Sequence, residues 1–330
     1  MMTTVDLPSL AAQPVPPFKS IPVIDISGLY GDVDSKIQVA SAIREACIQV
    51  GFFYVKTHGV AEAKITSALN AARQFFDQPM EEKMKIKFHR TNTTEGYHIR
   101  TRTGYSREAF EFTPKIDASN KSVPASDLWP SEDVIPGFRE AMLNYHISDE
   151  VYRLGSKLFQ AFALALNMPE DFFLDKVRSP IAHARVNHYT PQINTSTGLT
   201  SGIGEHTDAL YFTVLWQGEI PALQVMNTSR EWVTAQPIPG TFVINACFLD
   251  DIFKSTIHRA IVEPGIRRFS IPMFFGTDDD VVIDIVPTCI SASRPALYEP
   301  LLVSEFMKLR REQPLGADRQ PKKIPLPTPM

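Results

Sequence analysis

The sequence lacks any long apolar run and any long basic stretch. Without about twenty consecutive apolar residues, no membrane-spanning helix is expected. Residues 1–19 also lack the basic-then-apolar pattern of a secretory signal. The formal net charge is −4, from 33 basic and 37 acidic residues. Neither nucleic acid nor an anionic membrane is therefore expected as a partner.

Cysteine is also scarce. The three cysteines, Cys47, Cys247 and Cys289, lie far apart in apolar surroundings. Their odd number and wide spacing argue against a disulfide framework and against a cysteine-rich zinc site. We therefore expect buried, reduced thiols and a cytoplasmic location, where ferrous iron can persist.

The N-terminal half carries helical signals. Apolar residues recur at helical spacing over about 36–50, 61–76 and 136–166. The stretch 83–127 between them is polar and is expected to be irregular, which is typical of a functional or mobile loop. No internal repeat is present.

The C-terminal half is rich in short β-like runs separated by turn residues, which predicts an antiparallel sandwich or jelly roll and an α+β fold overall. These runs are 184–189, 211–216, 222–226, 241–246, 253–259, 269–275 and 281–286. The expected organisation is a flexible lead-in at 1–20, a mainly helical region at 21–170, a β-rich domain at 171–312 and a flexible tail at 313–330.

Three residues form a candidate metal site. His206 and Asp208 are two positions apart, so on an extended strand their side chains point to the same side. His258, in another strand-like run, can complete the set. Two imidazoles and one carboxylate leave coordination positions open, which suits iron(II), oxygen and a chelating cosubstrate, whereas a structural zinc site would be closed. A bare His-x-Asp pair is common by chance, so the site needs further support.

A candidate anion site follows the distal histidine. Arg268 and Ser270 alternate on one strand-like run, and a guanidinium with a nearby hydroxyl binds carboxylates well. The pair could hold the far carboxylate of a dicarboxylic keto acid, with Tyr189 as a further donor. Arg267 would take the inward position if the register moved by one residue, but the apolar Phe269 favours Arg268.

Together these residues resemble, in order and over about residues 21–310, the isopenicillin N synthase-like superfamily of iron(II)- and 2-oxoglutarate-dependent oxygenases. The matching segments are 21–25 (IPVID), 51–60 (GFFYVKTHGV), 75–79 (FFDQP), 187–189 (NHY), 206–208 (HTD), 254–259 (KSTIHR) and 268–270 (RFS).

The resemblance implies a distorted double-stranded β-helix, or jelly roll, flanked by helices of the N-terminal half. It implies that iron is held by the three predicted ligands and that oxygen and 2-oxoglutarate are cosubstrates. Asn187 and Tyr189 match the "NxY" element and Arg268 the "RxS" element that bind 2-oxoglutarate. His58 matches a structural histidine and is not expected to be a ligand.

The substrate is expected to be a small molecule, with a secondary metabolite as the best guess. Whether it is hydroxylated, desaturated or closed into a ring would depend on the shape of the pocket. The protein is expected to be a monomer. Pocket candidates come from the family's substrate-facing segments and from aromatic or basic character. They are Tyr97, Arg100, Arg102, Phe110, Tyr211 and Phe274.

One segment departs from the family pattern. Residues 245–253 are several residues shorter than usual before the distal ligand and lack the usual Gly-Asp pair. Two alternatives to a 2-oxoglutarate-dependent oxygenase stay open. One is an isopenicillin N synthase-like oxidase that uses no keto acid and whose "RxS" pair binds substrate instead. The other, which the shortened segment makes conceivable, is a catalytically silent binding protein.

Overall fold

The structure is a computed structural model. It describes residues 5–87, 95–102, 105–113, 115–116, 122–123, 128–147, 150–191, 200–208, 210–247, 252–253, 255–296 and 298–312. The predicted tail and residues 248–251 of the shortened segment before the distal ligand lie outside these residues. Within the described part, none of the helices is long and apolar enough to cross a membrane.

The helices come mainly from the N-terminal half. They are α1 (Leu7–Ala11), α2 (Val33–Gln49), α3 (Glu62–Phe76), α4 (Met80–Met84), α5 (Phe138–Ile147), α6 (Val151–Ala165) and α7 (Val303–Glu312), with 3₁₀ turns at Ser27–Tyr30, Leu174–Lys176 and Pro287–Cys289. Helix α2 begins earlier than predicted because Asp32 caps it by accepting a hydrogen bond of 2.8 Å from the Ser35 amide. The single helix predicted over 136–166 is two helices, α5 and α6.

Two sheets form the centre of the molecule. The large sheet has the order β1 (Val23–Asp25), β2 (Phe52–Lys56), β12 (Phe242–Ala246), β9 (Phe212–Trp216), β14 (Arg268–Phe275), β7 (Ala182–Tyr189), β4 (Tyr105–Phe112) and β3 (Gly96–Arg102). The small sheet has the order β11 (Trp232–Thr234), β10 (Leu223–Met226), β13 (His258–Val262) and β8 (Thr200–His206). Short pairs join β5 (Lys115–Ile116) to β6 (Ser122–Val123) and β15 (Val282–Ile283) to β16 (Leu301–Leu302).

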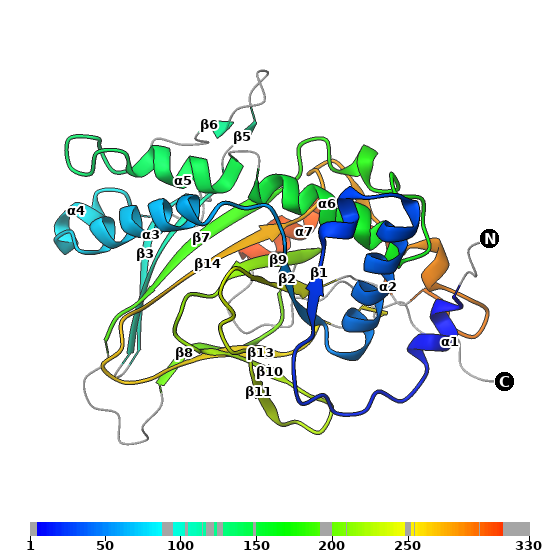
Figure 1. The fold of residues 1–330 in the computed structure, drawn as a ribbon. Helices are drawn as coiled ribbons and strands as arrows, with labels where there is room; N and C mark the ends of the chain where they lie inside the picture. The colour runs from blue at the N-terminus through cyan, green and yellow to red at the C-terminus, as the bar shows by residue number, and fades with distance from the viewer. Residues whose placement is uncertain are drawn as a thin grey trace.

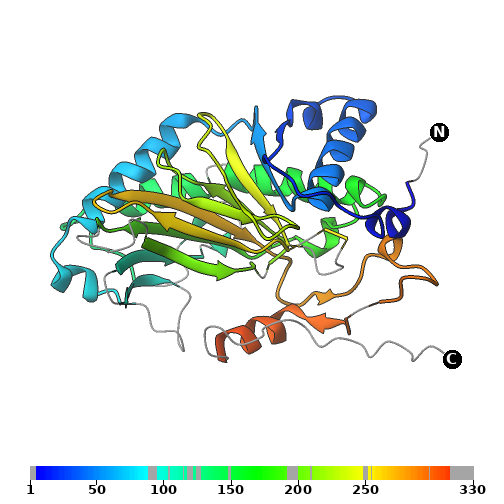
Figure 2. The ribbon, with the colours of Figure 1, turned by 90° about the horizontal axis from the view of Figure 1, so that it is seen from below.

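The helices and the small sheet cover opposite faces of the large sheet (Figure 1). Figure 2, seen from below, shows the strands in front of the N-terminal helices. The main core lies between the helices and the large sheet, where Phe75, Phe162 and Ile271 are all buried. A smaller apolar cluster, containing Tyr189 and Val262, lies between the two sheets. The candidate site described below lies in this inter-sheet layer, and we call the face of the large sheet toward it the pocket side.

The polar stretch 83–127 is not wholly irregular, so that prediction is wrong for β3 and β4. The two strands pair in antiparallel register, and β4 pairs with β7, so they extend the large sheet. Their charged residues hid the strand pattern. Arg107, Glu108 and Glu111 are buried at 4%, 3% and 7% exposure, because both faces of β4 are covered. The predicted strand at 253–259 is also displaced, since β13 begins only at His258.

Candidate active site

The three predicted metal ligands come from neighbouring ends of two paired strands. His206 is the last residue of β8, and His258 is the first residue of β13. The two residues are directly opposite in the antiparallel register, with ring centroids 4.2 Å apart. Asp208 lies two residues beyond β8. Residues 207 and 208 are thus outside the strand on which the sequence argument placed them.

The ligand atoms converge on one point. Nε2 of His206 and Nε2 of His258 lie 3.7 and 3.8 Å from Oδ1 of Asp208, and all three ligand atoms lie within 4.8 Å of one another. Nδ1 of His206 is 2.8 Å from the Gly204 carbonyl, and Nδ1 of His258 is 3.1 Å from the Thr256 carbonyl. Because a carbonyl only accepts, each Nδ1 carries the proton and each Nε2 presents a lone pair.

The carboxylate is oriented through its other oxygen. Oδ2 of Asp208 accepts hydrogen bonds of 2.6 Å from the Thr213 hydroxyl and 2.7 Å from the Asn245 amide. Burial alone would raise the pKa of Asp208, but His258, His206 and these two hydrogen bonds hold it below its ordinary value. Oδ1 is therefore an ionised ligand pointing at the two imidazoles. Sequence reasoning did not single out either donor.

The donor set fits ferrous iron. Two imidazoles and one carboxylate on one side of the ion leave its other coordination positions open for small ligands. The three protein ligands include no thiolate. Within the described residues this is the one group of three histidine, cysteine or acidic side chains that approach closely enough to hold an ion. Cys247 is nearby but buried, and burial raises its thiol pKa well above the ordinary value, so it stays protonated. The fold and the site together have the features of a mononuclear non-haem metal centre in a jelly roll, with His206, Asp208 and His258 as its candidate ligands.

The predicted anion anchors lie side by side on β14 and β7. Arg268 pairs with Tyr189 and Ser270 pairs with Asn187 in the antiparallel register. All four are buried, with exposures of 1% to 3%. The Asn187 amide lies 3.4 Å from the Ser270 hydroxyl, and the Arg268 guanidinium lies 4.8 Å from the centre of the Tyr189 ring. The four side chains therefore form one wall on the pocket side.

The Arg268 guanidinium is held by the backbone and keeps one nitrogen free of hydrogen bonds. Nε donates to the Ile220 carbonyl at 3.1 Å and Nη2 to the Gln217 carbonyl at 2.6 Å. Nη1 is buried and has no hydrogen-bond partner among the described residues. A buried cation with an unused donor is costly, so an anion such as a carboxylate would complete the site.

Arg267 faces the opposite way, so the register expected from Phe269 is the one observed. Its Nε donates 2.9 Å to Nε2 of His188, and its Nη2 lies 2.7 Å from the Asp77 carboxylate. Because Nε2 of His188 accepts, Nδ1 carries the proton and donates to Glu108 at 2.7 Å. These residues lie on the helix side of the sheet and take no part in the pocket.

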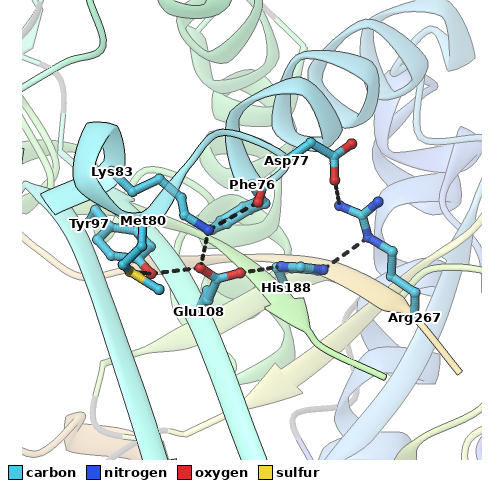
Figure 3. Close-up of polar contacts among 8 residues, drawn as sticks. All are labelled: Phe76, Asp77, Met80, Lys83, Tyr97, Glu108, His188 and Arg267. Carbon is cyan, nitrogen blue, oxygen red and sulfur yellow. Dashed lines mark hydrogen bonds and ion pairs between the residues drawn. The ribbon is translucent and has the colours of Figure 1, made fainter. Parts of the chain in front are cut away.

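Figure 3 shows that Glu108 is the centre of this helix-side network. Besides His188, its carboxylate accepts from the Lys83 ammonium of α4 and, at 2.6 Å, from the Tyr97 hydroxyl of β3. Burial alone would raise the pKa of Glu108, but the hydrogen bonds from these three groups lower it to about 2. The network joins α4 to three strands of the large sheet.

Two of the predicted substrate residues are wrong. Tyr97 is fully buried on the helix side, where it bonds Glu108, and Phe110 is fully buried with its ring 5.5 Å from Phe75. The aromatic character that suggested pocket contact reflects the helix-side core instead. Tyr211 packs against Phe159 of α6, with ring centroids 5.9 Å apart, which gives no support for a pocket role.

The other candidates have mixed outcomes. Phe274 stacks on His183 at 6.0 Å and lies on the same side of β14 as Ser270. Arg100 is exposed and pairs with Arg107 in the register of β3 and β4. The backbone of Arg102 lies in β3, but its side chain lies outside the described residues. Phe274 and Arg100 stay candidates.

Sequence reasoning missed the charged residues on the pocket side of β4. Arg107 and Glu111 alternate on this strand, and Glu111 binds Arg185 at 2.7 Å and His183 at 2.9 Å. Their alternation was visible in the sequence, but Glu108 between them is also charged. Without knowing that both sides of β4 are covered, the segment looked like a solvated loop.

His58, which matched the family's "HGV" element, is far from this chemistry. Its Nε2 lies 3.1 Å from the Gly240 carbonyl, and its Nδ1 accepts from the Val60 amide at 3.1 Å. These contacts secure a turn. Within the shortened segment, Ile252 and Phe253 are fully buried, while residues 248–251, and residue 254 after it, lie outside the described part.

Comparisons with known proteins identify the family of the chain. The family described as "non-haem dioxygenase in morphine synthesis N-terminal" matches residues 21–132, and the 2OG-Fe(II) oxygenase superfamily matches residues 180–277. A 2-oxoglutarate-Fe(II) type oxidoreductase, hxnY of Emericella nidulans, is 30% identical over 319 residues, which cover 89% of this chain and 90% of that protein. Homoarginine-6-hydroxylase 2-ODD-233 of Oryza sativa is 32% identical over 321 residues, covering 88% and 96%.

Solved structures agree as well. A full-length Neurospora crassa protein, solved in complex with alpha-KG and 5-formyluracil, has a TM-score of 0.78 at 26% identity, covering 88% of this chain and 95% of that chain. JOX2 in complex with 2OG, Fe and JA has a TM-score of 0.75 at 26% identity, covering 94% and 95%. The predicted α+β jelly-roll fold is confirmed.

The chain belongs to the 2OG-Fe(II) oxygenase superfamily. It is a non-haem oxygenase that depends on iron(II) and 2-oxoglutarate and acts on a small molecule. This result favours the first of the three hypotheses over a keto-acid-free oxidase and over a silent binding protein.

Proposed function

We propose that His206, Asp208 and His258 bind the iron(II) ion of this oxygenase. The convergence of their three ligand atoms within 4.8 Å is the observation that carries the proposal. Iron(II) held there supplies the activation of molecular oxygen, which oxidises 2-oxoglutarate to succinate and carbon dioxide and also oxidises the substrate. Thr213 and Asn245 keep Asp208 aimed at the ion.

The 2-oxoglutarate site is assigned to the wall of β14 and β7. Arg268 and Ser270 would bind the remote carboxylate, because the free guanidinium nitrogen and the hydroxyl face the same side of β14. Tyr189 adds a hydroxyl donor, and Asn187 orients Ser270 through their contact of 3.4 Å. Such fixed donors would orient the keto acid so that its other end reaches the iron.

The substrate is assigned to small metabolites, with secondary metabolism as the setting. The names of the relatives support this, since they include homoarginine-6-hydroxylase and azadirone synthase, which act on different small molecules. We also assign the enzyme to the cytoplasm, as a monomer without nucleic-acid partners. The net charge of −4 and the three free buried cysteines support that assignment.

The test is succinate formation by the full chain, purified without oxygen and then given iron(II), 2-oxoglutarate and air. Asp208→Ala removes the sole anionic ligand and should abolish both iron binding and succinate formation. Asp280→Ala is the matched control, because Asp280 is exposed and pairs with Arg178 at 2.9 Å. If the wild-type chain forms succinate and Asp208→Ala still does so, the metal assignment is contradicted.

A further inference from the structure

Arg107, a buried cation on the pocket side, has no anionic partner among the described residues. Arg107 of β4 is 4% exposed, and its Nε and Nη1 have no hydrogen bond within that part of the chain. The other described arginines of this wall differ. Arg185 lies 2.7 Å from the Glu111 carboxylate, and Arg268 donates two hydrogen bonds to backbone carbonyls. No described residue therefore compensates the charge of Arg107.

The strand register places Arg107 next to the assigned 2-oxoglutarate site. Tyr189 is directly opposite Arg268 on one side and directly opposite Arg107 on the other. Directly opposite residues on antiparallel strands share a face, so all three point to the pocket side. Strands are about 4.8 Å apart, so Arg107 and Arg268 lie roughly 10 Å apart, with Tyr189 between them.

The acidic residues of β4 do not neutralise Arg107. Glu108 points to the helix side, where it binds Lys83 and His188. Glu111 is on the pocket side, but its carboxylate is already shared with Arg185 and two histidines. Within the described residues, the pocket wall thus has two buried cations without a carboxylate partner, Arg268 and Arg107.

The positive potential at this wall is already visible on Tyr189. Burial alone would raise the pKa of the Tyr189 phenol, but the charges of Arg268 and Arg107, with side-chain hydrogen bonds to Ser270 and Arg268, hold it below its ordinary value. The remote carboxylate of 2-oxoglutarate would pair with the guanidinium of Arg268. A second anion is needed for Arg107, because leaving a buried guanidinium without a partner is strongly unfavourable.

We propose that Arg107 binds a carboxylate of the substrate and so makes this enzyme an oxygenase of small organic acids. The inference rests on the proposed function, since it assigns Arg268 to 2-oxoglutarate and leaves Arg107 for the molecule that is oxidised. The substrate carboxylate is only bound and is not changed in the reaction. Arg107 would fix the end of the substrate away from the C–H bond that reacts.

The experiment measures binding without turnover. The full chain is loaded with zinc(II) in place of iron and saturated with 2-oxoglutarate. It is then titrated calorimetrically with butyrate, benzoate, phenylacetate and 3-phenylpropionate, each beside its primary amide. These acids carry no second group that could chelate the metal. The wild-type chain should bind at least one acid about tenfold or more tightly than its amide, as expected for a charge-assisted contact.

Two variants and one control make the result specific. Arg107→Gln should remove the preference for the acid, and Arg107→Lys should keep part of it because the charge remains. Arg178→Gln is the control, since Arg178 is largely exposed and pairs with Asp278 and Asp280 away from the pocket. Equal binding of acid and amide, no binding of either, or an unchanged preference in Arg107→Gln would each overturn the proposal.

The affinity for 2-oxoglutarate separates this proposal from the proposed function. Arg107→Gln should bind 2-oxoglutarate within about twofold of the wild type. A loss as large as that of Arg268→Gln would assign Arg107 to the cosubstrate and overturn the proposal. If the wild-type chain itself bound no 2-oxoglutarate, the proposed function would fail. The comparison of acid and amide would then be made with zinc(II) alone in the wild type, Arg107→Gln and Arg268→Gln, and a preference for the acid that is lost in Arg107→Gln but kept in Arg268→Gln would still report on Arg107.

Discussion

The side-chain amide of Asn245 donates a hydrogen bond of 2.7 Å to Oδ2 of Asp208, the oxygen that faces away from the two histidines. Asn245 is 3% exposed on β12, and Asp208 lies beyond the end of β8. A residue of the large sheet therefore orients Asp208, while the other two candidate metal ligands, His206 and His258, belong to the small sheet. This contact links the two halves of the jelly roll at the metal site.

Asn245→Ala should weaken metal binding by about 10- to 100-fold, the usual effect of removing a group that orients a ligand. The Asp208 carboxylate would keep its hydrogen bond from Thr213 but could rotate away from the imidazoles. Zinc(II) or iron(II) titration of the purified chain measures the affinity. Asn227→Ala is the control, because Asn227 is also buried but bonds Phe18 and Glu231. Equal metal affinity in both variants would contradict the role given to Asn245.

Substitutions of the adjacent residues Arg267 and Arg268 should affect different properties. Arg268→Gln should weaken 2-oxoglutarate binding by roughly 10- to 100-fold, since it removes a charged hydrogen bond to the remote carboxylate. Arg267→Gln should leave that affinity unchanged but lower the melting temperature, because it removes the contacts to His188 and Asp77. Calorimetric titration and thermal unfolding of both variants check the pair. An exchange of the two outcomes would mean that the register had been assigned to the wrong face.

The sequence predicted those parts of the site that are encoded in a few neighbouring residues. The histidine and acidic ligands, and the Arg268–Ser270 pair, follow from residue type and alternation over a few positions. The choice of Arg268 over Arg267 also came from a local feature, the apolar Phe269 between the pocket residues. The structure brings the three predicted ligands together and buries Arg268 beside Tyr189, while the roles of these residues stay predictions.

The residues that the sequence misassigned or missed depend on which faces of a strand are covered by other elements. Tyr97 and Phe110 were assigned to the pocket, but helices α3 and α5 bury them on the other side. Arg107 was missed because a run with Arg107, Glu108 and Glu111 looks solvated unless both sides of the strand are known to be buried. Pairing of charges across distant strands leaves no local signal in a single sequence.

A glycine makes room for the ring of Tyr189. A Cβ on Gly202 would lie 2.9 Å from Cε1 of Tyr189 and 2.8 Å from Cγ2 of Val262. Gly202→Ala should therefore displace the Tyr189 ring and weaken 2-oxoglutarate binding, with a loss of stability of about 1–3 kcal/mol from overpacking. Gly204→Ala on the same strand is the control, since a Cβ there meets nothing within 4 Å. Equal 2-oxoglutarate affinity in the two variants would argue against a fixed position for Tyr189.

The Glu108 network should make stability depend on pH (Figure 3). Glu108→Gln leaves Lys83 buried without its anion, which should cost about 3–5 kcal/mol near pH 7. The folded pKa of Glu108, about 2, is lower than the unfolded value near 4.3. Its stabilisation is therefore complete above about pH 4.3 and is lost as the pH falls toward 2. Urea unfolding of both chains between pH 7 and 3 should show their difference shrinking with acid. Exposed Glu81→Gln should change little, and a difference that grew with acid would refute the assignment.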